Sequence, residues 1–215
     1  TYTDQHNGKI FTFNNFPEKK EVDDIYTLTA NVTDKAGNTT SETIRFSVNR
    51  FGSTYAIPKT TETLNGSYVQ NEQNVVMTET NANELKNIKV ILFKNGKTIT
   101  LKEGSDYKID VKGGNDKWYE YTYTVYSANF ADDGVYRLSF SSEDAAGNKA
   151  ENTLDTKNKE ISFSVDKTKP DIVVTNLENG LTYPVDKLAV TMSASDNILL
   201  ETVTVYLDDY DKVYK

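Results

Sequence analysis

Apolar and polar residues alternate along most of the chain, which is the pattern of strands that bury one face. In residues 25–33, Tyr26, Leu28 and Val32 fall on one face, and threonine and asparagine fall on the other. A period of two with one apolar face is typical of a half-buried antiparallel strand. The same alternation predicts strands at 44–48, 88–92, 136–140, 161–165, 188–192 and 203–207. Helical periodicity with capping residues is hard to find, so we expect an all-β chain.

Glycine-containing dipeptides separate the predicted strands, at 65–66, 95–96, 113–114 and 179–180. Asn95-Gly96 lies between two apolar runs, and this dipeptide favours a two-residue hairpin turn. We therefore predict a hairpin around Lys94–Lys97. Many short strands with regular turns are typical of a β-sandwich or barrel. We expect Leu138 and Phe140 to be buried and to face Val90 and Leu92 across the sandwich.

The chain repeats itself at an interval of about 110 residues. Asp34-Lys-Ala-Gly-Asn38 returns 110 positions later as Asp144-Ala-Ala-Gly-Asn148, and the region 65–92 matches 179–207 at 114 or 115 positions. A unit of about a hundred residues fits an immunoglobulin-like (Ig-like) sandwich. We expect the back half of one repeat in 1–52, a complete domain in 53–167 and the front half of another repeat in 168–215. The chain would then be a window on a longer tandem array.

Two structural motifs mark the predicted sandwich. Residues 132–138 have the Asp-x-Gly-x-Tyr-x-Leu spacing of a tyrosine corner, in which the Tyr136 hydroxyl bonds upstream backbone. Tyr26 and Leu28 keep the same spacing in the first repeat. In the Asp-x-Ala-Gly-Asn motif, glycine permits positive φ, and the Asp and Asn side chains cap turn amides. We interpret both motifs as structural.

Composition and charge exclude several kinds of function. The chain has 24 Lys+Arg against 32 Asp+Glu, a net charge of −8, which argues against nucleic-acid and anionic-membrane partners. No apolar run approaches the roughly 20 residues of a membrane helix. The chain has no Cys and one His, which excludes thiol chemistry, disulfides and His-rich metal sites. Neither a phosphate-binding loop nor a dinucleotide fingerprint is present, and His6 stands alone near a terminus, so we assign no catalytic residues.

Aromatic side chains are the best candidates for ligand binding. Tyr119, Tyr121 and Tyr123 alternate on one strand, with Trp118 on its other face. Core packing is the simpler interpretation of the tyrosines, and Phe11 and Phe13 hold matching apolar positions in the first repeat. The alternative is a sugar-stacking platform formed by an exposed Trp118 ring and Tyr119.

The repeated motifs resemble the tandem bacterial Ig-like domains of large Gram-positive cell-surface proteins. The resemblance rests on Tyr-x-Leu, Asp-x-Ala-Gly-Asn and Ile-x-Phe-Ser-Val-Asp-Lys-Thr-Lys-Pro, which ends at Pro170. It implies an extracellular, non-enzymatic stalk or adhesion module at the bacterial surface or in a secreted protein. Its partners would be neighbouring repeats and host proteins or glycans. The alternative is a carbohydrate-binding accessory module of a secreted or wall-associated enzyme.

No cofactor is expected, because calcium needs about 6–8 oxygen ligands and each candidate site offers few carboxylates. Calcium at Asp144 is the alternative to a plain turn. Some members of the resembled family bind calcium at their linkers through Asp, which makes Asp166 and Asp171 the other candidates. Pro170 has a fixed φ, so we expect the second linker to be stiffer than the linker containing Gly52.

Overall fold

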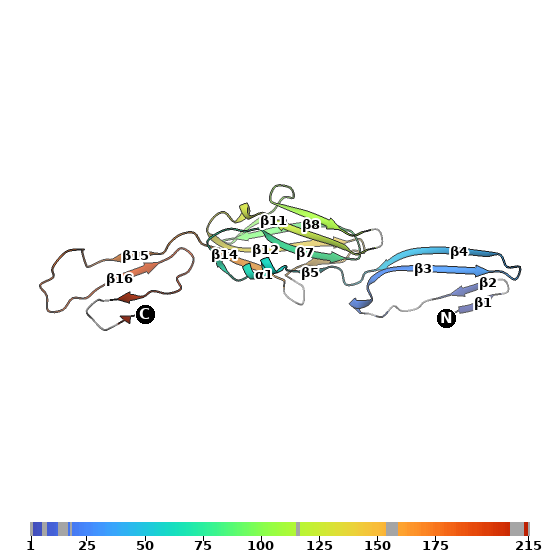
Figure 1. Ribbon diagram of the computed structural model, residues 1–215, viewed down its shortest axis with the longest axis horizontal. Helices are drawn as coiled ribbons and strands as arrows, with labels where there is room; N and C mark the ends of the chain where they lie inside the picture. The colour runs from blue at the N-terminus through green and yellow to red at the C-terminus, as the bar shows by residue number, and fades with distance from the viewer. Residues whose placement is uncertain are drawn as a thin grey trace.

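A computed structural model of the chain describes residues 2–5, 8–12, 17, 19–114, 117–153, 159–206 and 213–214. A two-sheet sandwich lies in the middle of an elongated molecule, with two-stranded sheets on either side (Figure 1). The first flank contains β1 (Tyr2–Gln5), β2 (Gly8–Phe11), a 3-10 turn (Lys20–Val22), β3 (Asp24–Thr33) and β4 (Thr39–Val48). The second contains β15 (Asp171–Val174), β16 (Met192–Ser195), β17 (Val205–Tyr206) and β18 (Val213–Tyr214).

The sandwich is formed by residues 54–165. One sheet has the order β10 (Tyr107–Lys112), β11 (Tyr119–Val125), β7 (Val75–Asn81) and β5 (Thr54–Ala56). The other has the order β6 (Tyr68–Val69), β14 (Ile161–Val165), β12 (Gly134–Asp144), β8 (Leu85–Lys94) and β9 (Lys97–Thr100), and β13 (Lys149–Glu151) pairs with β12. Among the strand pairs that the structure describes, all are antiparallel except β6–β14. A short helix, α1 (Lys59–Leu64), and a 3-10 turn (Ser127–Phe130) complete it. The chain thus has the predicted all-β, antiparallel Ig-like fold.

The predicted core is buried, but one of its pairings was wrong. Leu138, Phe140 and Val90 are fully buried, and Leu92 is 2% exposed. We expected β8 to face β12 across the sandwich. Instead, β8 lies beside β12 in the same sheet, with Leu138 opposite Leu92 in the register. Alternation assigns a residue to a face but carries no information about strand order, which is why the sequence did not settle it.

The aromatic residues of the sandwich fill its interior. Tyr121 and Tyr123 are buried, which confirms core packing for these members of the tyrosine stripe. The Phe130 ring packs edge-on against both Tyr136 and Phe163, at centroid distances of 5.3 and 5.1 Å. Such edge-to-face pairs add about 0.5–1.5 kcal/mol each beyond the burial of their area.

The predicted turn motifs are present. Asn95 and Gly96 both have positive φ, 47° and 79°, as the two-residue hairpin between β8 and β9 requires. The Tyr136 hydroxyl donates to the Asp132 carbonyl at 2.6 Å, and the Tyr26 hydroxyl donates to the Val22 carbonyl at 2.5 Å. Both tyrosine corners are therefore confirmed.

The two flanks leave apolar side chains at the surface. Phe11 is 66% exposed and Ile172 is 63% exposed. In a complete sandwich a second sheet would cover the apolar faces of their strands. Phe13 lies outside the described residues. The predicted strand at 188–192 is wrong in extent, because regular pairing begins only at Met192. Alternation alone does not form a strand where no neighbouring strand offers hydrogen bonds.

Leu138→Ala tests the core. It should lower the free energy of unfolding by about 2–5 kcal/mol, because it leaves a cavity at a fully buried position. Val135→Ala is the matched control on the same strand, at a position that is 50% exposed, and should change stability by only about 0.5 kcal/mol. Urea denaturation measures both. Equal costs for the two variants would show that the assigned inner face is wrong.

Candidate functional site

The most highly organised polar site lies where the first flank joins the sandwich. Asp144, at the end of β12, is 1% exposed. Its Oδ2 accepts hydrogen bonds from the side-chain amides of Asn49 at 2.8 Å, Asn148 at 3.0 Å and Asn81 at 3.3 Å. Its Oδ1 accepts the Asn148 backbone N–H at 2.9 Å. A carboxylate with this many donors is satisfied without a metal ion. We call Asn49, Asn81, Asn83, Asp144 and Asn148 the joint network.

Asn49 is the linker residue that ties the two parts together. Besides Asp144, its Nδ2 approaches Asn81 Oδ1 at 2.7 Å and Asn83 Oδ1 at 2.9 Å. Its own backbone carbonyl accepts from Asn148 Nδ2 at 3.0 Å. An amide has only two N–H protons, so three acceptors share them. Every one of these acceptors belongs to the sandwich, so the network fixes the linker to it.

Gly52 is required by the same geometry. Its φ is +67°, and a Cβ there would lie 3.1 Å from Asn148 Cβ. The Gly52 N–H donates to Asn49 Oδ1 at 3.2 Å. A side chain at this position would be strained by its backbone and would press on the joint network.

Asp23 anchors the linker from the side of the flank. It is 5% exposed and accepts from the backbone amides of Arg50 at 2.7 Å and Phe51 at 3.1 Å. The Arg50 guanidinium pairs with the same carboxylate at 2.8 Å. Burial is the largest single influence on the pKa of Asp23 and raises it. The hydrogen bonds and the Arg50 charge together outweigh burial and hold the pKa below its ordinary value.

Two further hydrogen bonds cross directly between the flank and the sandwich. Trp118 Nε1 donates to Asp24 Oδ1 at 2.8 Å, and Asn83 Nδ2 donates to Ser47 Oγ at 2.8 Å. The Trp118 bond is the main cause that lowers the pKa of Asp24, with the Ile25 amide second. Trp118 is half-buried, not the exposed ring that the platform hypothesis required. A ligand role for Trp118 stays a prediction.

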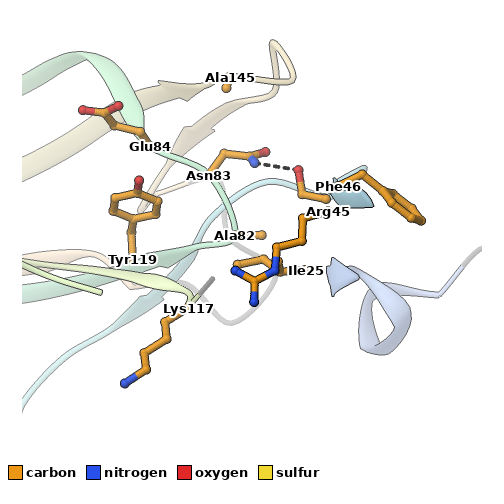
Figure 2. Close-up of a pocket in the computed structure, with 10 residues that line it drawn as sticks. Ile25, Arg45, Phe46, Ala82, Asn83, Glu84, Lys117, Tyr119 and Ala145 are labelled. Carbon is orange, nitrogen blue, oxygen red and sulfur yellow. Dashed lines mark hydrogen bonds between the residues drawn. The ribbon is translucent and has the colours of Figure 1, made fainter. Parts of the chain in front are cut away.

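An open cleft of about 260 Å³ lies at this joint (Figure 2). From the flank it is lined by Ile25, Arg45, Phe46 and Ser47, and from the sandwich by Ala82, Asn83, Glu84, Lys117, Tyr119 and Ala145. Tyr119, the other residue of the predicted platform, thus lines it, half-buried, and Trp118 does not. No local pattern could predict that Arg45 and Phe46 line one cleft with Tyr119, because they are more than 70 positions away along the chain.

The second joint is held by hydrogen bonds from exposed residues to Asp133, which is half-buried. Asp133 Oδ1 accepts the Lys167 amide at 2.9 Å, and its Oδ2 accepts Thr168 Oγ1 at 2.5 Å and Asn197 Nδ2 at 2.9 Å. The Thr168 bond is the first cause that holds the pKa of Asp133 below its ordinary value. Burial and then the Asp196 carboxylate raise the pKa of Asp166. The buried hydrogen bonds lie at the Gly52 joint, and the greater stiffness of the Pro170 linker stays a prediction.

The calcium candidates are not brought together. Asp144 lies at the first joint, Asp166 at the second, and Asp171 is exposed at the start of β15. Within the described ranges, no group of three or more His, Cys, Asp or Glu side chains is arranged to hold a metal ion. Calcium binding at these residues stays a prediction. His6 lies outside the described residues.

A buried carboxylate inside the sandwich escaped the sequence analysis. Glu79 on β7 is fully buried, and accepts from Tyr123 at 2.6 Å and from Ser142 on the opposite sheet at 2.5 Å. Burial and then the Glu79 charge raise the pKa values of Tyr123 and Tyr55 well above the usual range. Glu79 and Asn81 continue the inward face that begins at Val75 and Met77, and this register could have revealed them.

One family model matches part of the chain and agrees with the Ig-like fold. The model of the family described as "Bacterial Ig-like domain" matches residues 7–50. A search of curated proteins finds no match. Among solved structures, the chain is similar to one titled "Crystal structure of Dpr2 Ig1-Ig2 in complex with DIP-Theta Ig1-Ig3". The two are 12% identical with a TM-score of 0.36, and the match covers 65% of this chain and 40% of that one. In the part of the chain that the structure describes, no helix is long and apolar enough to cross a membrane.

The pH dependence of Trp118 fluorescence tests the contact between the flank and the sandwich. Trp118 is the single tryptophan of the chain, so all tryptophan emission comes from the ring that makes this contact. Because the folded pKa of Asp24 lies below its ordinary 3.8, the contact should be complete above that pH and should be lost as the pH falls through the lower folded value. In Asp24→Asn this titration should disappear. An identical titration in Asp24→Asn would contradict the contact.

Proposed function

We propose that the chain is a non-enzymatic spacer and adhesion module of an extracellular bacterial surface protein. The observation that carries this proposal is the joint network, which ties the first flank to the sandwich through buried hydrogen bonds. A spacer must hold its ends apart, and this needs fixed joints between its units. The match of the bacterial Ig-like family model to residues 7–50 supports the class.

The network can stiffen the joint because breaking it is costly. Asp144 and Asn81 are 1% and 0% exposed, so water reaches them only if the joint opens widely. A buried polar group left without a partner costs about 1–3 kcal/mol, and a charged one more. Rotation of the flank about the linker would separate Asn49 from three acceptors at once. At the second joint Asp133 is half-buried and its donors Lys167, Thr168 and Asn197 are exposed, so water can replace these bonds more easily.

We further propose that residues 1–52 and 168–215 are parts of neighbouring repeats around the complete domain at 53–167. In the first flank Tyr26 stacks on Phe46 with a centroid distance of 5.6 Å and an interplanar angle of 21°. In the sandwich the corresponding Tyr136 stacks on Phe163 at 5.7 Å and 26°. The strand registers agree too, since Tyr26 opposes Phe46 and Tyr136 opposes Phe163. Similar local geometry in two places supports a common repeat.

The partners of such a module are the neighbouring repeats of its own chain, together with host proteins or glycans. A second candidate function is a carbohydrate-binding accessory module of a secreted or wall-associated enzyme. Tyr119, a residue of the predicted sugar-stacking platform, lines the cleft at the joint, and this supports the second candidate. Neither function requires a catalytic residue in this chain.

Asp144→Ala tests the spacer proposal, with Asp34→Ala as the matched control. Asp34 makes the same turn bonds with Asn38, at 2.8 Å to its amide and side chain, but is exposed and lies away from the joint network. Small-angle X-ray scattering should show a shorter mean and broader distribution of end-to-end distances for Asp144→Ala only. If Asp144→Ala does not fold, Asn49→Ala tests the same joint, because Asn49 lies outside the sandwich. It should change the distribution of end-to-end distances in the same way.

Unchanged scattering profiles for both Asp144→Ala and Asn49→Ala, with the sandwich still folded, would contradict a joint fixed by this network. Urea denaturation of the same samples reports whether the sandwich is intact.

A further inference from the structure

We propose that the first flank of one copy of this chain docks on the second flank of another copy, and that the two flanks together form one complete Ig-like sandwich. The inference rests on the proposed repeat organisation, in which the flanks are the back half and the front half of a repeat. It goes beyond that proposal because it assigns a partner, a second copy of the chain, to the apolar side chains that both flanks expose.

The first flank exposes side chains whose counterparts in the sandwich belong to the core. Leu28 opposes Ile44 in the register of β3 and β4. Leu138 and Ile161 form the same pair between β12 and β14, and both are fully buried. Leu28 is 43% exposed and Ile44 is 53% exposed, so the flank lacks the cover that the sandwich provides.

The second flank contains strands that match the covering sheet. Ile172 of β15 opposes Ala194 of β16, and in the sandwich Tyr55 of β5 opposes Glu79 of β7. The two registers coincide when β5 is shifted by 117 positions and β7 by 115 positions. The interval of 117 positions also separates the repeated Phe-Ser-Val segments that end β4 and β14. The second flank therefore carries the counterparts of β5 and β7.

These counterparts are exposed as well. Tyr55 is 3% exposed, whereas Ile172 at the corresponding position is 63% exposed. Met77 of β7 is fully buried, whereas Met192 of β16 is 37% exposed. In the sandwich, residues of β5 and β7 share one core with residues of β12 and β14 from the other sheet. The two flanks therefore expose complementary parts of one core, one part from each sheet.

Unpaired strand edges on the two flanks match each other in the same way. In the sandwich, β11 pairs with β7 and β12 pairs with β8, and these pairings join its back half to its front half. The first flank has the counterparts β2 and β3 at an interval of 110 positions, and the second has β16 and β17 at 115. Among the strands that the structure describes, β3 pairs only with β4, and β16 only with β15. Such edges can pair with another chain.

The partner is a second copy because the two flanks of one chain lie on opposite sides of its sandwich (Figure 1). The chain exposes 15551 Å² of surface, whereas a compact monomer of its mass, 24.2 kDa, exposes about 10,000 Å². A stable interface between two proteins buries about 1,200–2,000 Å² in total. The excess surface is therefore larger than such an interface needs.

Sedimentation equilibrium of the whole chain tests whether copies associate head to tail. Contacts between two different surfaces either continue into an open chain or close into a ring. We expect the average mass to rise with concentration to at least twice that of one chain. Salt should strengthen the association, because it screens the repulsion between copies that each carry a net charge of −8. A monomer at every concentration, or an association that salt weakens, would overturn the inference.

Two single substitutions disable one flank each. Ile44→Asp places a charge on the apolar face of the first flank, and Met192→Asp does so on the second flank. Each variant alone should stay monomeric at concentrations where the parent associates. An equimolar mixture should form a dimer and nothing larger, because each variant supplies the flank that the other has lost. The mixture is informative even if the substituted flanks unfold, since the dimer uses only the unsubstituted ones.

Val135→Asp is the matched control, because Val135 is 50% exposed but lies on the sandwich, outside both flanks. This variant should associate like the parent. An equal loss of association in Val135→Asp would mean that added charge alone prevents it, and would overturn the inference. A mixture that stays monomeric would overturn it too. A dimer of Met192→Asp alone would overturn it in favour of pairing between two first flanks.

Scattering profiles of Ile44→Asp separate this inference from the spacer proposal, because a monomer reports on its joint without association. A fixed joint together with no dimer in the mixture would overturn the association and leave the spacer role intact. A mobile joint together with a dimer in the mixture would contradict the spacer role and leave the association intact.

Discussion

The buried Asp144 carboxylate is the constraint on which the arrangement of the chain depends. In water it would be solvated, and at the joint it is covered by Asn49, Asn81 and Asn148. The burial is tolerable because side-chain and backbone N–H groups supply the lost hydrogen bonds. Since one of these donors comes from the linker, the carboxylate has its full set of donors only when the flank is docked. A local need for hydrogen bonds thereby becomes a constraint on the orientation of two units.

The sandwich provides the rigid frame that this constraint needs. Its interior is close-packed around Phe130, Tyr136 and Phe163, whose rings lie 5.1–5.7 Å apart. Glu79 adds hydrogen bonds between the two sheets, from Tyr123 on one and Ser142 on the other. Strands β7 and β12, one from each sheet, end in Asn81 and Asp144, so their fixed ends bring the joint network together. The cleft follows from the same arrangement, because it opens between these strand ends and β4.

Most of the fold could be predicted from the sequence, and most of the site could not. Alternation located β3, β8 and β12, and the tyrosine corners at Tyr26 and Tyr136 followed from a local spacing. The pairing of β8 with β12 in one sheet could not be predicted, because a period of two carries no information about which strands are neighbours. The motif at Asp144 was correctly interpreted as a turn, with bonds to Asn148 like those of Asp34 to Asn38. Its role at the joint depends on Asn49, which is 95 positions away and carries no local signal.

A distance measurement across the first joint tests the central claim most directly. The chain has no cysteine, so spin labels at Thr27→Cys on β3 and Thr98→Cys on β9 would be its only labels. Both positions are exposed and lie outside the joint network. Pulsed electron paramagnetic resonance should give one narrow distance distribution, which broadens when Asn49→Ala is added. A distribution that is already broad in the labelled parent, and is unchanged by Asn49→Ala, would contradict a joint fixed by the buried carboxylate.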